Sequence, residues 1–284
     1  WGIKVFYDFD EGAQMQGVTW EEPVVHGIKS VVEGEDGIAG TGDEPDVISL
    51  TSGCRGCGGN GVNAGAIAID WAASQGIVVT QSSGNGGPNF YGVNSRGTNH
   101  NGITVGRLNS DNWDPSLPNG GTYVIDPSSS RGPTRDIRIK PDLVAPGQNL
   151  KAPVVGGGYK NASGTSFSTP YIAGISALIL QKNPEWTPEM VKAALMNTAT
   201  PLEGYRLVTQ GAGALNKDRA VAAEVLAMPP SLSFGLTTIG DEIIREISIS
   251  NTGSEPVTLN LSANTNVYKG DVYPWNHSSF VGNT

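Results

Sequence analysis

The sequence predicts an α/β domain with a parallel sheet covered by helices on both faces, followed by the start of an all-β segment. Two observations carry this prediction. Down to about residue 200, short β-branched runs alternate with longer runs whose apolar residues have helical spacing, and strands separated by helices form parallel sheets. From about residue 229, apolar and polar residues alternate one by one, which is typical of strands with one exposed face.

The elements of the first 200 residues can be placed in order from the spacing of their apolar residues. The predicted strands are residues 3–7, 47–50, 77–80, 103–105 and 143–145, and the predicted helices are residues 24–32, 62–75, about 166–181 and a run that begins at Pro188. The strand at 47–50 is expected to be buried. Gly76 ends the second helix, because glycine tolerates the left-handed backbone of a helix stop. Thr187 caps the last helix and Pro188 takes its first position.

The pair Pro229-Pro230 predicts a boundary between two domains, residues 1–228 and residues 229–284. Residues 231–234, 243–251 and 257–261 have the period of two that strands show. This pattern predicts the opening of a fibronectin- or immunoglobulin-like β-sandwich, with about 55 residues here against roughly 100 for a whole one.

The composition argues against two classes of function. The chain has 18 basic and 27 acidic residues and a net charge of −9, which argues against nucleic acid as its main partner. No run approaches the roughly 18 apolar residues that a membrane-spanning helix needs, so we expect no transmembrane segment. Charged residues at 16% and 39 glycines fit a compact domain with many turns.

The most informative segment is residues 164–170 (Gly-Thr-Ser-Phe-Ser-Thr-Pro), which places Ser166 at the start of a strongly apolar helix. Free backbone N–H groups and the helix dipole favour a developing negative charge at such a position. Ser166 is therefore either a nucleophile or a helix-capping serine, and capping is the commoner role of a serine there.

This segment resembles the nucleophile motif of the subtilases, usually Gly-Thr-Ser-Met-Ala-Thr/Ser-Pro. Three further segments match the family in the same order: residues 46–53 resemble the strand and loop that line its substrate cleft, residues 82–87 its oxyanion segment, and residues 140–147 the strand before its nucleophile. Four ordered matches across about 125 residues favour the nucleophile over the cap. The resemblance implies a subtilisin-like fold and a serine endopeptidase.

The resemblance also implies a role for individual residues. Ser166 would attack the scissile carbonyl, and Asn85 would donate its side-chain amide to the oxyanion together with the backbone N–H of Ser166. From its surroundings alone, Asn85 would be interpreted as a turn residue of a glycine-rich loop; its position in a matching segment 81 residues before Ser166 favours the oxyanion role. The walls of the specificity pocket would be small residues whose backbone is free to pair with an extended peptide, namely Thr51, Ser52, Gly53, Ser82, Ser83 and Gly84. Phe167 and Ser168 stand where the family usually has Met and Ala, and the bulkier Phe would alter the leaving-group side of the cleft.

The catalytic base of the family has no match in this sequence. The triad of subtilases runs Asp, His, Ser along the chain, and His26, His100 and His277 are the only histidines. None lies in a His-Gly-Thr-His-like segment, so each is interpreted as a structural or surface residue. We expect the catalytic Asp and His upstream of Trp1, together with two strands of the sheet, one of them beside the strand at 47–50. The chain alone is therefore expected to be inactive and poorly folded.

Cys54 and Cys57 follow the cleft loop directly. A disulfide that tightens this loop is the first interpretation, given the extracellular setting that the resemblance implies, and two free thiols are the second. A zinc site would need two further ligands, and a thioredoxin-like role lacks the context of that fold.

Three functions follow from these observations. The first is a secreted or cell-surface endopeptidase that acts on polypeptides through an acyl-enzyme, and the second is an inactive subtilase-fold binding or scaffold protein. A different serine hydrolase is disfavoured, because Ser166 does not lie in a Gly-x-Ser-x-Gly elbow. No cofactor is expected to be required for catalysis and no metal ligand is assigned. The acidic residues at 33–36 and 43–44 favour a solvated loop over a structural calcium site.

Overall fold

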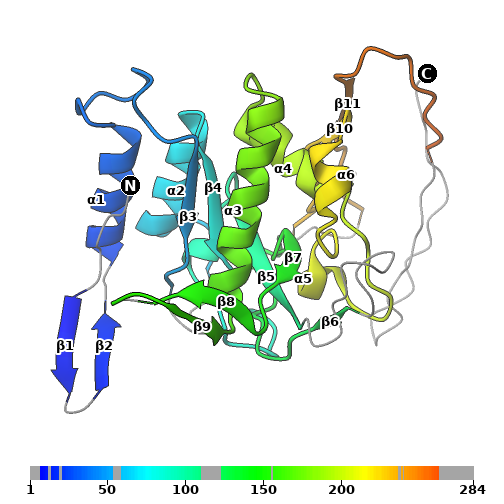
Figure 1. The fold of residues 1–284 in the computed structure, drawn as a ribbon. Helices are drawn as coiled ribbons and strands as arrows, with labels where there is room; N and C mark the ends of the chain where they lie inside the picture. Colours follow the sequence, from blue (N-terminus) through cyan, green and yellow to red (C-terminus); the bar gives the residue numbers. More distant parts are fainter. Residues whose placement is uncertain are drawn as a thin grey trace.

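The centre of the molecule is a five-stranded sheet (Figure 1). The computed structural model describes residues 7–11, 14–18, 21–53, 59–109, 123–154, 156–235, 238 and 240–261. The parallel strands of the sheet are β3 (Val47–Leu50), β4 (Val78–Ser82), β5 (Ile103–Asn109) and β7 (Leu143–Pro146). A short strand, β6 (Val124–Ile125), pairs antiparallel with the end of β5. The predicted parallel sheet is thus confirmed.

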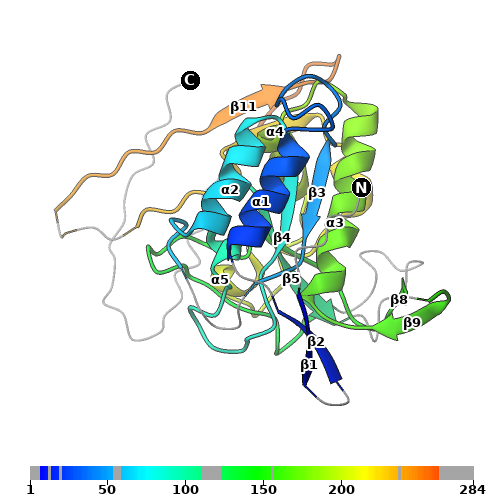
Figure 2. The ribbon, with the colours of Figure 1, turned by 90° about the vertical axis from the view of Figure 1, so that its left-hand side faces the viewer.

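Helices cover both faces of this sheet, as Figures 1 and 2 show. One face packs against α1 (Glu21–Val32) and α2 (Ala64–Ser74), and the other against α3 (Thr165–Lys182), α4 (Pro188–Asn197) and α6 (Lys217–Val221). Neighbouring residues of β4 show the alternation, because Val78 belongs to the core under α3 and Val79 to the core under α1 and α2. Both faces of the central strands are therefore buried, as expected of a parallel sheet.

The remaining elements are short. They are the hairpin β1 (Tyr7–Glu11) and β2 (Gln14–Val18), the hairpin β8 (Leu150–Pro153) and β9 (Tyr159–Ala162), the turn of 3₁₀ helix η1 (Arg96–Thr98), the helix α5 (Leu207–Gln210), and the pair β10 (Val225–Met228) and β11 (Ser248–Asn251). None of the helices in the described part of the chain combines the length and hydropathy needed to cross a bilayer.

The helix ends show why these residues start and stop helices. The side chain of Asn63 accepts a hydrogen bond from the backbone N–H of Ala66 at the start of α2, and Gly76 follows its end with φ of +94°. Thr187 caps α4 as predicted, accepting from the N–H of Met190 at 3.3 Å. These contacts occupy backbone groups that a helix end leaves unpaired.

Two expectations about the sheet need correction. β3 is half-buried rather than buried, because among the described strands it pairs only with β4 and so lies at the edge. The predicted first strand lies mostly outside the described residues, and its last residue, Tyr7, belongs to the β1–β2 hairpin.

The alternating segment after residue 229 forms less strand than its pattern predicts. Residues 231–234 and 257–261 form no strand, and residues 243–251 form one only at Ser248–Asn251. That strand, β11, pairs with β10 across the expected boundary at residue 228. The β-sandwich and the division into two domains stay predictions.

Candidate active site

The predicted site residues gather at one edge of the sheet. In a parallel sheet, the residues that follow the strands meet at the carboxyl edge, where such folds place their ligands. Thr51 follows β3, Ser83 follows β4 and Gly147 follows β7. The same edge receives the start of α3, because the N–H of Gly164 donates to the carbonyl of Gly147 at 2.9 Å.

Asn85 and Ser166 lie side by side at the start of α3. The Oδ1 atom of Asn85 accepts hydrogen bonds from the backbone N–H of Thr165 at 3.0 Å and from its hydroxyl at 3.1 Å. A backbone N–H can only donate, so the oxygen of the amide must face the helix. The Nδ2 end then points away from Thr165, and no described residue accepts from it. Asn85 thus lies in a loop, as expected of a turn residue, and it also forms a fixed hydrogen bond with the segment that contains Ser166.

A second free donor lies beside this amide. Gly164 is the N-terminal cap of α3, so Ser166 is the second residue of an 18-residue helix rather than its cap. The N–H of Thr165 is taken by Asn85, and that of Phe167 donates to the carbonyl of Gly164 at 3.0 Å. The N–H of Ser166 has no acceptor among the described residues. Two donors at a helix N-terminus can stabilise the negative charge of a tetrahedral intermediate.

The start of α3 is tied to β7 by its side chains. The buried hydroxyl of Ser168 donates to the carbonyl of Ala145 at 3.0 Å, and the hydroxyl of Thr169 donates to the carbonyl of Thr165 at 2.8 Å. Ser168, which departs from the usual alanine of the family motif, therefore adds a hydrogen bond that holds the serine loop against the sheet.

Replacing Gly147 with alanine is expected to destabilise the protein by about 1–3 kcal/mol, the usual cost of adding a methyl group to a packed site. The new Cβ would overlap the hydroxyl of Ser168 and lie 2.8 Å from the carbonyl oxygen of Gly164. Urea unfolding of the full-length protein measures the change. Gly174→Ala is the control, because its Cβ would meet nothing within 4 Å and alanine favours a helix by up to about 1 kcal/mol. Equal losses in the two variants would contradict this packing argument.

The two predicted pocket walls are in direct contact. The hydroxyl of Ser82 donates to the carbonyl of Thr51 at 3.1 Å, and Gln81 Nε2 donates to the carbonyl of Ser52 at 3.0 Å. Thr51 and Gly53 are exposed, whereas Ser52 is buried. The first wall is therefore open to solvent at two of its three positions, although the carbonyl of Thr51 already accepts a hydrogen bond from Ser82.

The second wall is less open than the resemblance implies. Ser82 and Ser83 are buried, and their carbonyls accept from the side-chain amide of Asn94 at 2.6 Å and from its backbone N–H at 2.9 Å. The carbonyl of Gly84 accepts from the N–H of Ser130 at 2.9 Å. The expectation that this backbone is free to pair with a peptide is wrong for these three carbonyls. The assignment of the residues to the pocket stays a prediction.

Asn94 lies between the two walls and was not identified from the sequence. A Cβ built on Gly53 would lie 2.6 Å from Asn94 Oδ1, and one built on Gly84 would lie 3.5 Å from Asn94 Cβ. Asn94 is fully buried and its Oδ1 accepts from the N–H of Gly97 at 2.9 Å. Its only signal in the sequence is an asparagine among turn residues, which is too common to single out.

Arg96 is a second residue that the sequence did not reveal. Its buried guanidinium donates to the hydroxyl of Ser52 at 2.7 Å and forms an ion pair with Glu21 at 3.2 Å. Arg96 thus fixes the first wall to the start of α1. Buried charged groups require such partners, but the partners lie 44 and 75 positions away in the chain.

Neither described histidine lies near Ser166. His100 precedes β5 at the amino edge of the sheet, opposite the serine, and its Nδ1 lies 3.1 Å from Asp70 Oδ2. His26 is exposed on α1, 3.9 Å from Glu22. Both therefore fit the interpretation as structural or surface residues. His277, Cys54 and Cys57 lie outside the described residues.

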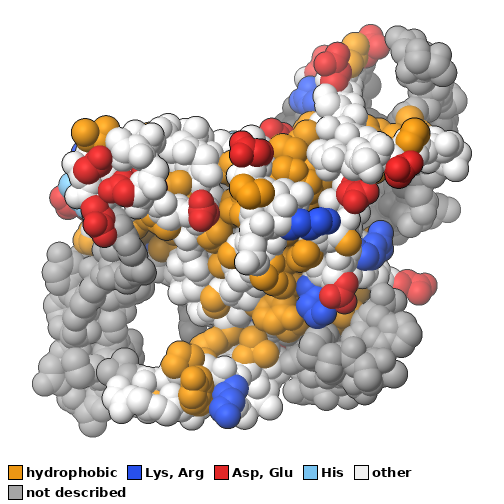
Figure 3. Space-filling model, turned by 45° about the horizontal axis from the view of Figure 1, so that its top comes forward, with side chains coloured by type: hydrophobic (Ala, Val, Ile, Leu, Met, Phe, Trp, Pro, Cys, Tyr) orange, Lys and Arg blue, Asp and Glu red, His pale blue; other side chains and the backbone are white. Residues whose placement is uncertain are grey.

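The acidic loop between α1 and β3 uses its carboxylates to bind backbone. Asp43 accepts from the N–H groups of Glu35 at 2.7 Å and Asp36 at 3.1 Å, and Glu44 accepts from that of Thr41 at 3.0 Å. Acidic side chains gather over this part of the molecule in Figure 3. The carboxylates thus organise the loop itself, and a calcium site there stays a prediction.

Comparisons with known proteins agree with this arrangement. The sequence model described as "Subtilase family" matches residues 13–218. "Serine protease AprX" of Bacillus subtilis (strain 168) is 38% identical over 171 residues, which are 55% of this chain and 38% of AprX. "Minor extracellular protease Vpr" of the same organism is 40% identical over 153 residues, 48% of this chain and 19% of Vpr. The chain therefore spans well under half the length of either relative.

Solved structures show the same fold at low identity. A serine-to-alanine mutant of the protease domain of PatA has a TM-score of 0.55 and 20% identity, covering 71% of this chain and 64% of that domain. The prenylagaramide maturation protease PagA has a TM-score of 0.55 and 21% identity, covering 75% of this chain and 70% of PagA. At this level of identity the likeness concerns the fold alone.

Proposed function

This chain belongs to the subtilase family, and on that premise we propose that it carries the nucleophile and the oxyanion hole of a serine endopeptidase. The hydrogen bond from Thr165 to Asn85 is the observation that supports this proposal most. It turns the oxygen of the Asn85 amide toward Thr165 at the start of α3, and it leaves the Nδ2 donor of Asn85 and the backbone N–H of Ser166 without acceptors among the described residues. The names of AprX and Vpr, both proteases, support the same reaction class.

The proposed reaction is acyl transfer. Ser166 Oγ attacks the carbonyl carbon of an extended polypeptide and gives its proton to a base, and the carbonyl oxygen becomes an oxyanion. The N–H of Ser166 and the Nδ2 of Asn85 then donate hydrogen bonds to that oxyanion and stabilise the negative charge that develops in the transition state. Expulsion of the amine, which takes up the proton, leaves an acyl-enzyme on Ser166, and water hydrolyses it.

We propose that the base and its orienting carboxylate come from a segment upstream of Trp1. The histidines at 26 and 100 lie elsewhere, and β3 has no partner on its outer edge among the described strands. α3 also exposes apolar surface, including Leu178. A further strand beside β3 would pair with its free edge and cover such surface, and would bring a histidine to the carboxyl edge.

The substrate is proposed to be an extended polypeptide outside the cell or at its surface. The solvent exposure of Thr51 and Gly53 supports pairing with an extended chain. Asn94, between the walls, would form a polar floor of the pocket and shorten it. The extracellular setting is supported by the name of Vpr. No cofactor is proposed for the chemistry.

A fluorophosphonate probe tests the proposal on the full-length protein, because it reacts with serines that a neighbouring base activates. We expect modification of Ser166 in the native protein and none after denaturation in urea, with the site identified by peptide mass spectrometry. The alternative, an inactive subtilase-fold binding protein, predicts an unmodified Ser166 in the folded protein. A folded, unlabelled protein would therefore overturn the endopeptidase.

A further inference from the structure

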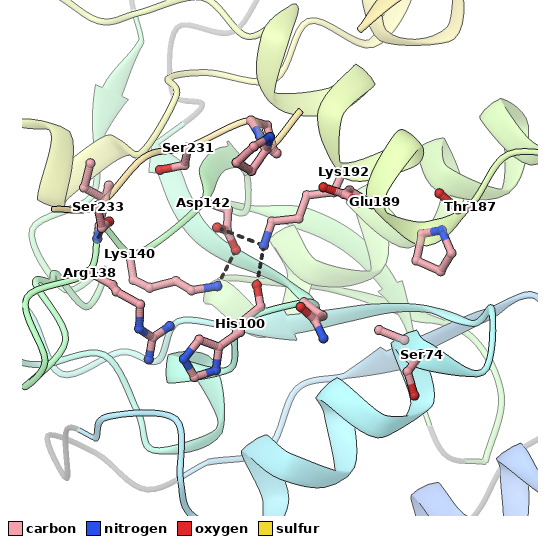
Figure 4. A pocket seen from close by; sticks show the side chains of 16 residues that line it. Ser74, His100, Arg138, Lys140, Asp142, Thr187, Glu189, Lys192, Ser231 and Ser233 are labelled. Atoms are coloured by element: carbon pink, nitrogen blue, oxygen red, sulfur yellow. Dashed lines mark hydrogen bonds and ion pairs between the residues drawn. The ribbon is translucent and has the colours of Figure 1, made fainter. Parts of the chain in front are cut away.

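A pocket of about 590 Å³ lies at the amino edge of the sheet, away from Ser166. Its walls come from separate parts of the chain: the end of α2, the segment before β5, the segment before β7, the start of α4, and residues 229–233. Figure 4 shows Lys140, Asp142 and Lys192 meeting at its centre, with His100 and Arg138 nearby. The proposed reaction uses none of these residues.

The centre of the pocket holds more positive than negative charge. Lys140 Nζ lies 2.6 Å and Lys192 Nζ 3.3 Å from the carboxylate of Asp142, and all three side chains are buried. Among the described residues, Asp142 is the sole carboxylate within ion-pair distance of either lysine. Two ammonium groups thus share one carboxylate. A buried charge without a counter-charge is costly.

The hydrogen-bond donors of the two lysines are used unequally. Lys192 donates to the carbonyls of His100 and Gly102, both at 2.9 Å, and contacts Asp142, so its three N–H groups have partners. Lys140 donates to Asp142 and, at 3.1 Å, to the hydroxyl of Thr104. An ammonium group has three N–H donors, and the third of Lys140 has no acceptor among the described residues. Lys140 is among the residues that line the pocket and its side chain is only 3% exposed, so a ligand could reach this donor only from within the pocket.

Other groups on the wall could hold the same ligand. Arg138 lines the pocket, but its guanidinium is ion-paired with Asp136 at 2.6 Å and donates to the carbonyl of Thr98 at 2.7 Å. His100 also lines the pocket; its side chain is about half exposed and is paired with Asp70 at 3.1 Å. Ser231 adds a hydroxyl from the segment after β10, and Glu189 is the only other carboxylate among the described residues of the wall. Burial, with smaller contributions from Lys192 and Arg138, lowers the pKa of Lys140 to about 7 against the attraction of Asp142. A bound anion would favour the charged form of this lysine.

We propose that this pocket binds a small oxyanion, which Lys140 contacts directly and which supplies the counter-charge that the two lysines lack. Sulfate, phosphate and carboxylate groups share this chemistry, since each presents acceptor oxygens to N–H and O–H donors. The bound anion would also connect the segment before β7 to residues 229–233, because both line the pocket.

Isothermal titration of the full-length protein with sodium sulfate and with sodium acetate tests the proposal, against sodium chloride at equal ionic strength. We expect saturable binding of sulfate, of acetate or of both. Binding of sulfate alone would indicate a site for a tetrahedral anion, and binding of acetate alone would indicate a site for a carboxylate. Lys140→Met should weaken that binding by about 10- to 100-fold, the effect of one charged hydrogen bond. Lys151→Met, a matched change at an exposed lysine of β8, should not. No saturable binding, or equal affinity in Lys140→Met, overturns the proposal.

A pH series on the unmodified protein serves if Lys140→Met does not fold. Sulfate keeps its charge between pH 6 and 8, so a loss of affinity as the pH rises through about 7 reports the deprotonation of Lys140. The charged groups that face Lys140 are Asp142, Lys192 and Arg138, with His100 and Glu189 on the same wall. The series is therefore repeated in His100→Asn, where the loss of affinity should persist. Affinity that is constant with pH in both proteins contradicts direct contact with Lys140.

Discussion

Replacing Ser166 with alanine in the full-length protein is expected to lower kcat on a peptide substrate by about 10⁶-fold, a figure taken from the catalytic serine of subtilisin. The change removes the oxygen that forms the acyl-enzyme in the proposed mechanism and leaves the proposed backbone donor of the oxyanion hole in place. The measurement is the initial rate of hydrolysis at saturating substrate. Stability should hardly change, because no described group donates to or accepts from the Ser166 hydroxyl.

Ser163→Ala provides the matched control for this prediction. Ser163 lies in the same loop and is exposed, and its hydroxyl accepts only from the N–H of Asn149, at 2.9 Å. Its loss should leave kcat within about threefold, corresponding to well under 1 kcal/mol. Activity that survives in Ser166→Ala but falls in Ser163→Ala would place the nucleophile elsewhere.

Replacing Asn85 with alanine is expected to lower kcat by about 10²–10³-fold with little change in KM, as loss of the corresponding donor does in subtilisin. The side-chain N–H acts on the charge that develops in the transition state, so the substrate itself should bind almost as before. Steady-state kinetics on one peptide separate the two parameters. A change confined to KM would assign Asn85 to substrate binding.

Asn85→Asp separates the chemical role of Asn85 from its structural one. The alanine variant also removes the acceptor of the Thr165 N–H, so a displaced helix could by itself lower the rate. Aspartate keeps that acceptor, but it replaces the Nδ2 donor with an acceptor oxygen and adds a negative charge beside the proposed oxyanion. We therefore expect kcat to fall at least as far in Asn85→Asp as in Asn85→Ala. Wild-type turnover in Asn85→Asp would show that the amide does not donate to an oxyanion.

Local sequence patterns predicted most of the fold, because the periodicity that distinguishes helices from strands depends on residues that are close together in the chain. The capping of α4 by Thr187 and the stop at Gly76 depend on contacts within a few positions, and both were found as predicted. The alternating runs at 231–234 and 257–261 were wrong as strands, because a strand also needs a partner, and no local pattern names one.

The candidate site was likewise predicted only in part from the sequence. The order of four family motifs predicted that residue 85 would meet residue 166, and the contact of Asn85 with Thr165 agrees with it. Asn94 and Arg96 could not be found, since each acts through residues distant in the chain. The edge position of β3 agrees with the expectation that a strand beside residues 47–50 lies upstream of Trp1, whereas the expected burial of β3 was wrong because no described strand pairs with its other edge.

The contact between Asn85 and Thr165 joins residues 80 positions apart. A chain that is still being synthesised, or one unfolded by heat, would have the Ser166 hydroxyl without the proposed oxyanion donor of Asn85 beside it. Such a chain would not be expected to react with peptides. Reactivity would arise only when β4 and α3 have docked. In the proposed mechanism, the hydrogen bond between Thr165 and Asn85 would therefore also protect other proteins, and the chain itself, from cleavage before folding is complete.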